Sequence, residues 1–210
     1  KMPEVPLSHH GGLESVLDVA YLGPQGSFSE QAAFEHFGHA INSVRCDSFD
    51  EVFRAVEAGQ ADVGVVPVEN STEGAVNRTL DLLLNSPLKI IGERSIQIHH
   101  NLLTKSGTME GVTRIVAHPQ ALAQCRGWLT RNYPSITLDA ASSNSEAARL
   151  ASQNPSVAAI AGDHAAHAWE LQAVSSGIQD DPQNRTRFLA VGRIETLPTG
   201  DDQTSIILAV

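Results

Sequence analysis

The sequence predicts an α/β protein with two lobes, mainly parallel sheets and a central cleft. From Leu17 onward, short aliphatic runs alternate with amphipathic segments, which is typical of strand–helix units. The pattern forms two sets of three units, separated by a long extended stretch at residues 88–103. Strand–helix alternation produces mainly parallel sheets covered by helices on both faces. The separating stretch is therefore expected to cross from one lobe to the other.

Capping residues mark the first set of units. Ser27 and Ser48 are each followed three residues later by glutamate, which is the spacing of a capping box at a helix start. Gly38 and Gly59 follow the two amphipathic segments and are expected to end them. The expected strands are 19–22, 42–46 and 62–67, and the expected helices are 27–37, 48–59 and a third at about 75–84.

The second set repeats this organisation. Pro119 suits the first turn of a helix, and Ser143 with Glu146 forms a further capping box. The expected strands are 114–117, 136–140, 157–161 and, after an apolar run at 188–191, a last one at 205–210. The expected helices are 119–133, 143–152 and 163–171. We expect the first lobe to contain about 18–96 plus 180–210, and the second about 97–179.

Composition limits the possible partners and the compartment. The net charge of −10 argues against a nucleic-acid partner, because binding phosphates requires a basic face. No apolar run approaches the roughly 18 residues that span a membrane. Residues 1–17 are polar, lack the apolar core of a signal peptide and are interpreted as a linker or cloning remnant. Two lone cysteines, Cys46 and Cys125, favour a reducing compartment, so a cytoplasmic location is expected.

Two turns could face a ligand. Residues 23–29 form a glycine turn that enters a helix N-terminus, which presents backbone N–H groups and hydroxyls to an anion. The turn lacks the glycine spacings of nucleotide-binding loops, so a simple strand–helix connection is an open alternative. Residues 69–74 place a carboxylate and an amide after a buried strand. Glu69 could act as an acid or orient a ligand, or the loop could only cap the following helix.

Histidines do not indicate a metal site. His99 and His100 are adjacent, so on an extended chain they point to opposite faces and cannot chelate one ion together. No HExxH motif or dense carboxylate cluster accompanies them. Neither a metal nor another cofactor is expected.

The stretch from Asn184 to Phe188 precedes an apolar run. Arg185 and Arg187 are two residues apart, so an extended chain would direct both to one face and Thr186 to the other. Two guanidinium groups and a hydroxyl suit an anionic ligand, but an ordinary loop-to-strand junction has the same composition.

Six stretches, taken in order, resemble the prephenate dehydratase family, which includes the related arogenate dehydratases. They extend over most of the chain from Val19 onward and include the threonine–arginine–phenylalanine signature at residues 186–188. The matching stretches are YLGPQGSFS at 21–29, PVENSTEG at 67–74 with DLL at 81–83, HNLL at 100–103, HPQALAQC at 118–125, SNSEAA at 143–148 and NRTRF at 184–188.

The resemblance implies a fold and an activity. It implies two lobes like those of type 2 periplasmic binding proteins, with an active site between them. It also implies a cofactor-free carbon–oxygen lyase that converts prephenate into phenylpyruvate, water and CO2 in phenylalanine biosynthesis. The implied catalytic residues are Thr186, Glu69 and Asn70. The implied substrate-binding residues are Ser27, Phe28, Ser71, Gln124, Ser143, Asn144, Asn184, Arg187 and Phe188. Ala117 stands where some members carry a serine, so no hydroxyl role is carried over to it.

The resemblance also implies partners. Members of the family are often fused to a chorismate mutase domain and to a phenylalanine-binding ACT domain, and they suggest a homodimer. Residues 203–210 resemble the first strand of an ACT domain. A two-lobed module that binds a small anion without turnover is an alternative, and so is an arogenate dehydratase, because no residue decides between the two substrates.

Overall fold

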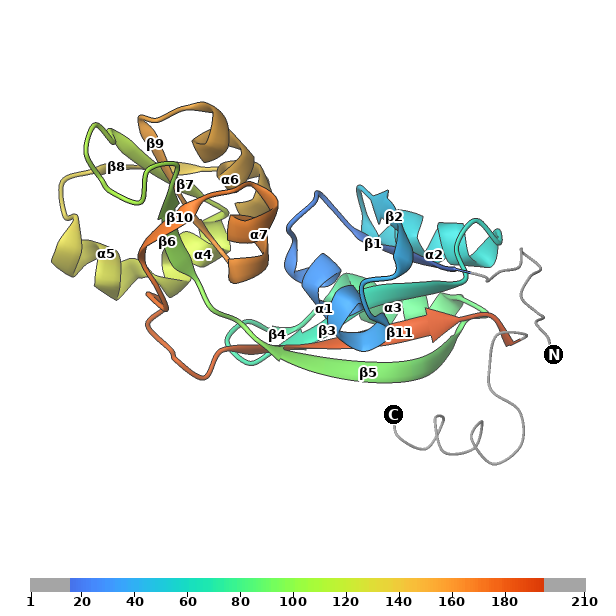
Figure 1. Ribbon diagram of the computed structural model, residues 1–210. Helices are drawn as coiled ribbons and strands as arrows, with labels where there is room; N and C mark the ends of the chain where they lie inside the picture. The colour runs from blue at the N-terminus through green and yellow to red at the C-terminus, as the bar shows by residue number, and fades with distance from the viewer. Residues whose placement is uncertain (1–15, 195–210) are drawn as a thin grey trace.

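The computed structural model describes residues 16–194, which form two lobes side by side (Figure 1). The segment before residue 16 and the predicted strand at 205–210 lie outside the described residues. The first lobe contains β1 (Leu17–Leu22), α1 (Phe28–Phe37), β2 (Ile41–Cys46), α2 (Phe49–Glu57), β3 (Val63–Asn70), β4 (Gly74–Ala75), α3 (Asn77–Asn85), β5 (Lys89–Gln97) and β11 (Arg185–Gly192). The second lobe contains β6 (Asn101–Thr104), β7 (Arg114–Ala117), α4 (Pro119–Gln124), α5 (Arg126–Asn132), β8 (Thr137–Ala140), α6 (Asn144–Gln153), β9 (Val157–Ala161), α7 (Asp163–Ala168) and β10 (Gln172–Ser175).

Each lobe is built on one mixed sheet. The first sheet has the order β2-β1-β3-β11-β5, with β4 paired to β3, and the second has the order β10-β6-β9-β7-β8. In the first sheet β1 runs parallel to β2 and β3, whereas β11 runs antiparallel to β3 and β5. In the second, β7 runs parallel to β8 and β9, whereas β6 runs antiparallel to β9 and β10. The two-lobed α/β fold is confirmed, but the expectation of mainly parallel sheets is wrong.

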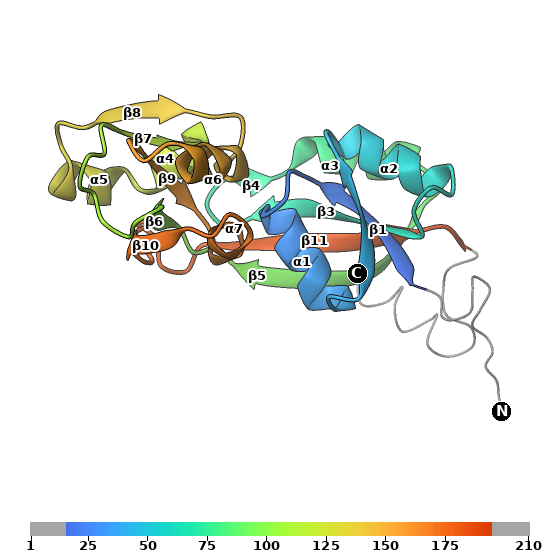
Figure 2. The ribbon, with the colours of Figure 1, turned by 45° about the horizontal axis from the view of Figure 1, so that its top comes forward.

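The antiparallel pairs have a simple origin. β5 leads out of the first lobe and β11 leads back into it, so the two strands lie side by side in opposite directions (Figure 2). The chain crosses between the lobes twice, and the crossings are bonded to each other. The Ile98 N–H donates to the Asn184 carbonyl at 2.8 Å, and the Ile178 N–H donates to the His100 carbonyl at 2.8 Å.

The strands at the centre of each sheet are buried on both faces. On β1, Val19 and Tyr21 pack into one aliphatic cluster, while Ala20 packs into another on the opposite face. The second lobe has the same arrangement, with Val116 on one face of β7 and Ile115 on the other. Continuous apolar runs are what a sheet covered on both faces requires.

All three predicted capping serines cap their helices. Ser27, Ser48 and Ser143 each accept a hydrogen bond from the backbone N–H three residues later, at 2.9 to 3.1 Å. The predicted helix at 119–133 is instead two helices, because the backbone leaves helical geometry at Cys125. The carboxylate of Asp180 accepts hydrogen bonds from the N–H groups of Gly127 and Trp128 and thereby caps the N-terminus of α5. Within residues 16–194, no helix is long and apolar enough to cross a membrane.

Candidate active site

A cavity of about 660 Å³ lies between the lobes. The first lobe contributes the turn before α1, the end of β3 and the start of β11, and the second contributes the starts of α4, α6 and α7. This is the place expected for a ligand, at strand ends and helix N-termini. Eight of the predicted site residues line it, namely Ser27, Phe28, Asn70, Gln124, Ser143, Asn144, Thr186 and Phe188.

Thr186 and Asn70 face each other across neighbouring strands at the cavity wall. Thr186 is 8% exposed, and its Oγ1 accepts a hydrogen bond from Asn70 Nδ2 at 2.6 Å. The orientation of the Asn70 amide is fixed because its Oδ1 accepts from the backbone N–H groups of Thr72 and Glu73, at 2.9 and 3.0 Å. Its NH2 group must therefore face Thr186. The hydroxyl hydrogen of Thr186 is left to donate toward a ligand.

An irregularity in β3 decides which side chains reach the cavity. Arg187 pairs with Glu69, but the next residue, Phe188, pairs with Pro67, so Val68 is an extra residue on β3. Such a bulge reverses the alternation of faces along the strand. Asn70 consequently lines the cavity together with Pro67, whereas Glu69 does not.

Glu69 and Arg187 pair with each other instead of lining the cavity. Arg187 Nη2 lies 3.2 Å from Glu69 Oε1, and Arg187 Nη1 lies 3.4 Å from Glu93 Oε1. The side chain of Glu69 is 56% exposed. As alternation predicts for an extended chain, Arg185 and Arg187 are more exposed than the buried Thr186 between them.

Ser71 and Asn184 support the cavity wall from behind. The Arg185 N–H donates to Ser71 Oγ at 2.9 Å, and the Ser71 N–H donates to the Arg185 carbonyl at 2.8 Å. Asn184 is 1% exposed, and its Oδ1 accepts from Thr72 Oγ1 at 3.0 Å. Its Nδ2 donates to Gln124 Oε1 at 3.0 Å. The structure thus joins Asn184 to the cavity through Gln124 and does not place it at the wall.

The turn before α1 is held by a buried carboxylate. Glu30 is 1% exposed and accepts hydrogen bonds from the Gly26 N–H, the hydroxyl of Tyr21, and Arg45. It also lies 2.8 Å from His164 Nε2 of the second lobe. Burial alone would raise the pKa of Glu30, but the hydrogen bonds outweigh burial and lower it to about 2. A permanent carboxylate therefore fixes this turn at neutral pH.

Hydroxyl and amide groups at the start of α6 face the turn before α1 across the cavity. Ser143 Oγ accepts from the Glu146 N–H, which leaves its hydroxyl hydrogen to donate outward. Asn144 Oδ1 accepts from the His118 N–H at 2.9 Å, so its NH2 group is also left to donate. In contrast, the Ser27 hydroxyl donates to the Leu22 carbonyl at 2.8 Å, so its hydrogen is not left to donate to a ligand.

Three ionisable side chains at the cavity were not predicted as site residues: Glu73, His100 and His118. The sequence contains signals for them, since Glu73 belongs to the loop after β3 and both histidines lie in the matching stretches. His118 Nδ1 accepts from the Gln120 N–H at 3.0 Å, so Nε2 is the nitrogen left for a ligand. His100 is 2% exposed, and burial lowers its pKa. His99, in contrast, is exposed, as expected for adjacent residues on opposite faces.

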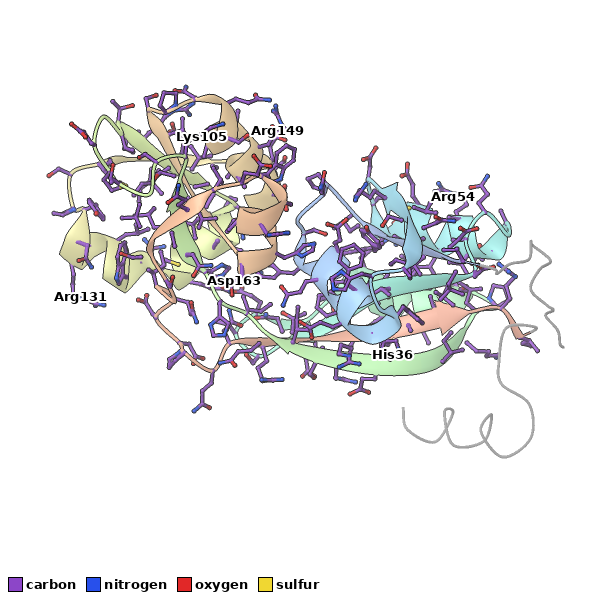
Figure 3. The ribbon with its side chains drawn as sticks, in the orientation of Figure 1. His36, Arg54, Lys105, Arg131, Arg149 and Asp163 are labelled. Atoms are coloured by element: carbon purple, nitrogen blue, oxygen red, sulfur yellow. The ribbon has the colours of Figure 1, made fainter. Side chains whose placement is uncertain are left out.

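The cavity is lined by neither lysine nor arginine in the part of the chain that the structure describes. The labelled Arg54 and Arg131 lie at the far ends of the two lobes (Figure 3). The N-termini of α1 and α6 lie at the cavity instead, and the first backbone N–H groups of a helix, which have no partner within it, favour negative charge. In the part of the chain that the structure describes, no three His, Cys, Asp or Glu side chains are grouped so that they could hold a metal ion.

Fold and site together define a two-lobed α/β protein with a cavity between its lobes, where an apolar lining carries several hydrogen-bond donors for a small ligand. The chain belongs to the prephenate dehydratase family, because the model of that family matches residues 19–196.

Known relatives agree with this assignment. A bifunctional chorismate mutase/prephenate dehydratase from Pseudomonas aeruginosa is 51% identical over 199 residues, which cover 94% of this chain and 54% of the relative. The chloroplastic arogenate dehydratase 5 of Arabidopsis thaliana is 41% identical over 209 residues, which cover 97% of this chain and 48% of the relative. The solved prephenate dehydratase from Arthrobacter aurescens in complex with L-Phe has a TM-score of 0.78 and 33% identity, covering 88% of this chain and 63% of that chain. The chain thus spans about half the length of the curated relatives it matches.

Proposed function

We propose that this chain is the dehydratase part of a longer enzyme and converts prephenate into phenylpyruvate, water and CO2 in phenylalanine biosynthesis. The enzyme class would be a carbon–oxygen lyase, and the step would need no cofactor. Family membership and the similarity to bifunctional enzymes support the proposal. The observation that carries it is the hydrogen bond from Asn70 Nδ2 to Thr186 Oγ1, which makes Thr186 a donor toward the cavity.

The reaction requires a donor at one position. The bond between the ring and its carboxylate breaks and releases CO2, and the electron pair enters the ring. The C4–O bond breaks at the same time, and the departing hydroxide takes up one proton, relayed from solvent through the hydrogen-bond donor, to become water. Because the ring becomes aromatic, the driving force lies in the substrate. The protein has only to orient the substrate and assist the leaving oxygen, and a positioned proton donor contributes about 10²–10⁴-fold in rate.

Thr186 is the residue we place at the leaving hydroxyl. Its oxygen accepts from Asn70, and a hydroxyl that accepts one hydrogen bond is a stronger donor in the next. Thr186 and Asn70 are therefore the proposed catalytic pair. Glu69 lies on the other side of β3 from Asn70, so its role as an acid stays a prediction from the resemblance.

Two helix N-termini would hold the two substrate carboxylates. The first turn of α1, at Phe28, and the first turn of α6, at Asn144, line the cavity from opposite lobes. Helix N-termini bind carboxylates without a cation. Ser143 and Gln124 would add side-chain donors, and Ser27 and Phe188 would shape the wall. Binding roles for Ser71, Asn184 and Arg187 stay predictions, because none of them lines the cavity.

A spectroscopic assay of phenylpyruvate formation tests this function. The chain should release phenylpyruvate from prephenate, and the same assay with arogenate should show which of the two it prefers. If the chain binds prephenate without turning it over, it is a binding module and the proposal fails.

The same proposal extends to assembly and location. Relatives named as bifunctional, of which this chain covers 54%, support fusion to a chorismate mutase domain. The resemblance supports an ACT domain and a homodimer, and the lone cysteines support a cytoplasmic location. Light scattering coupled to size exclusion should give twice the monomer mass of 22.4 kDa, and a monomer would contradict the dimer.

A further inference from the structure

The ring of His100 is held rigidly at the first crossing between the lobes. Its backbone N–H donates to Gln179 Oε1 at 2.9 Å, and its carbonyl accepts from the Ile178 N–H at 2.8 Å. Its ring packs edge-on against Phe28, with ring centroids 5.8 Å apart. With 2% of the residue exposed, the ring has little freedom to turn. No catalytic or binding role has been given to His100 above.

The side-chain amide of Gln124, in the second lobe, is hydrogen-bonded to a residue of the first lobe and to both segments where the chain crosses between the lobes. Its Oε1 accepts from His100 Nε2 at 2.7 Å and from Asn184 Nδ2 at 3.0 Å. Its Nε2 donates to Glu73 Oε2 at 3.3 Å. A carboxylate only accepts hydrogen bonds, so the NH2 group of Gln124 must face Glu73.

This orientation determines where His100 carries its proton. With the Gln124 oxygen facing His100, the ring must donate through Nε2. Burial lowers the pKa of His100 below its ordinary value and outweighs the hydrogen bond to Gln124, which acts in the opposite direction, so the ring is neutral at pH 7. Nδ1 is then unprotonated, and it has no hydrogen-bond partner among the described residues. A ring in this state is a fixed donor to Gln124 and holds no second proton to release.

We propose that His100 is a positioning residue that fixes the orientation of the Gln124 amide in the cavity. One N–H of Gln124 is engaged by Glu73, and the other remains to donate to the ligand. Without the donor of His100, the amide loses the shortest of its three hydrogen bonds and is held only by Asn184 at 3.0 Å and Glu73 at 3.3 Å. The flipped amide, which would present its oxygen to an anionic substrate, would then be less strongly disfavoured. This inference rests on the proposed function, because it describes how the same cavity binds its substrate.

Two variants of matched length test the proposal. His100→Gln keeps an amide N–H close to the position of Nε2, whereas His100→Met has similar length and no donor. We expect kcat/KM for prephenate to stay within about threefold in His100→Gln and to fall at least about tenfold in His100→Met, mainly through KM, as for a lost hydrogen bond to a charged group. The neighbouring, exposed His99→Met is the matched control and should leave kcat/KM unchanged.

A double-mutant cycle and the pH profile separate positioning from other roles. If His100 acts through Gln124, His100→Met should cost little more in a Gln124→Met background, and the pH profile of His100→Gln should match that of the unaltered chain. Equal losses in His100→Gln and His100→Met, with one limb of the pH profile removed, would make His100 an acid or base and overturn the proposal. An unchanged kcat/KM in His100→Met would also overturn it.

The tautomer is testable without turnover or substitution. In ¹⁵N NMR spectra of the unaltered chain at pH 8, His100 should be a neutral ring protonated at Nε2. A ring protonated at Nδ1, or at both nitrogens, would overturn the proposal even if His100→Met does not fold. If the unaltered chain shows the expected tautomer but no turnover of prephenate, the proposed function fails and the arrangement of His100 and Gln124 stands.

Discussion

The hydroxyl of Thr186 donates toward the cavity because its oxygen already accepts from Asn70. The Asn70 amide is oriented in turn by two backbone N–H groups, which donate to its oxygen. The main chain after β3 therefore determines that Asn70 donates and Thr186 accepts in the bond between them. Neither residue is charged. A search of the sequence for charged groups ranks Arg185 and Arg187 higher, and only the resemblance to the family indicates Thr186.

Reversing the donor and acceptor roles of Asn70 and Thr186 should strongly reduce turnover. Asn70→Asp keeps the shape of the side chain and can keep both bonds from the backbone, but it presents a carboxylate oxygen to Thr186. The threonine hydroxyl would then donate to that carboxylate rather than to the substrate. We expect kcat to fall at least about 100-fold, the scale of a positioned proton donor, with an unchanged circular dichroism spectrum. A kcat within threefold of that of the unaltered chain would refute the assigned donor and acceptor roles.

The extra residue in β3 explains why Glu69 and Asn70, adjacent in sequence, have different surroundings. Without a bulge at Val68, the alternation along β3 would place Glu69 on the face of Pro67. The predicted strand ended at residue 67, and residues 69–74 were expected to form a loop. A local sequence pattern does not specify that β3 continues to Asn70, because this extension depends on pairing with β11 more than a hundred residues away.

Glu69→Gln tests whether Glu69 is catalytic, as the resemblance to the family implies, or lies outside the site, as its absence from the cavity lining indicates. The exposed pair of Glu69 with Arg187 should contribute at most about 1 kcal/mol to the free energy of unfolding. We therefore expect the loss of kcat in Glu69→Gln to be at least tenfold smaller than in Asn70→Asp, measured with prephenate at pH 7. Equal losses would restore Glu69 as an acid in the reaction.

The start of α6 should contribute to both stability and substrate binding, whereas the start of α2 should contribute to stability alone. Ser143 and Ser48 are matched N-caps, so replacing either with alanine should lower the free energy of unfolding by about 1 kcal/mol. Only Ser143 lines the cavity with a free hydroxyl hydrogen. We expect Ser143→Ala to raise KM about tenfold and Ser48→Ala to leave it unchanged. Equal KM values in the two variants would exclude Ser143 from substrate binding.

Sequence patterns predicted the local elements better than their pairing. The capping serines and the apolar runs indicated the helices α1, α2 and α6 and the central strands correctly, because these signals act within a few residues. The directions of β5, β6, β10 and β11 were not predicted, because they depend on where the chain crosses between lobes. The break at Cys125 was also missed, since Asp180, which starts α5, is distant in sequence.

Contacts on both sides of the cavity tie the two lobes together. On one side, Glu30 contacts His164 and the Trp169 indole donates to the Gln25 carbonyl at 3.2 Å. On the other side, Gln124 of the second lobe donates to Glu73 of the first. Gly162 permits the close approach, because a side chain there would meet the ring of Phe28 at 2.7 Å. No pattern in the sequence predicted these pairs, since their residues lie in different lobes.

The stability of the whole molecule should depend on the ionisation of Glu30. Its pKa is about 2 in the folded protein and near the ordinary value of 4.5 when unfolded. The unfolded chain therefore binds more protons between these values, so the stabilisation is complete above about pH 5 and is lost as the pH falls toward 2. It amounts to on the order of 3 kcal/mol.

Urea unfolding of Glu30→Gln tests this dependence. The variant should be less stable than the unaltered chain at pH 7, and the difference between the two should shrink at pH 3.5. A difference that is the same at both pH values would contradict a low pKa for Glu30.

Steady-state turnover of prephenate by Thr186→Val and Thr186→Ser measures what the Thr186 hydroxyl contributes to the reaction. Valine keeps the shape of threonine and removes the donor, whereas serine keeps the hydroxyl. We expect kcat for phenylpyruvate formation to fall at least about 100-fold in Thr186→Val and to stay within about tenfold in Thr186→Ser, with both variants folded. Near-normal turnover by Thr186→Val would contradict the role of Thr186 as the donor to the leaving hydroxyl.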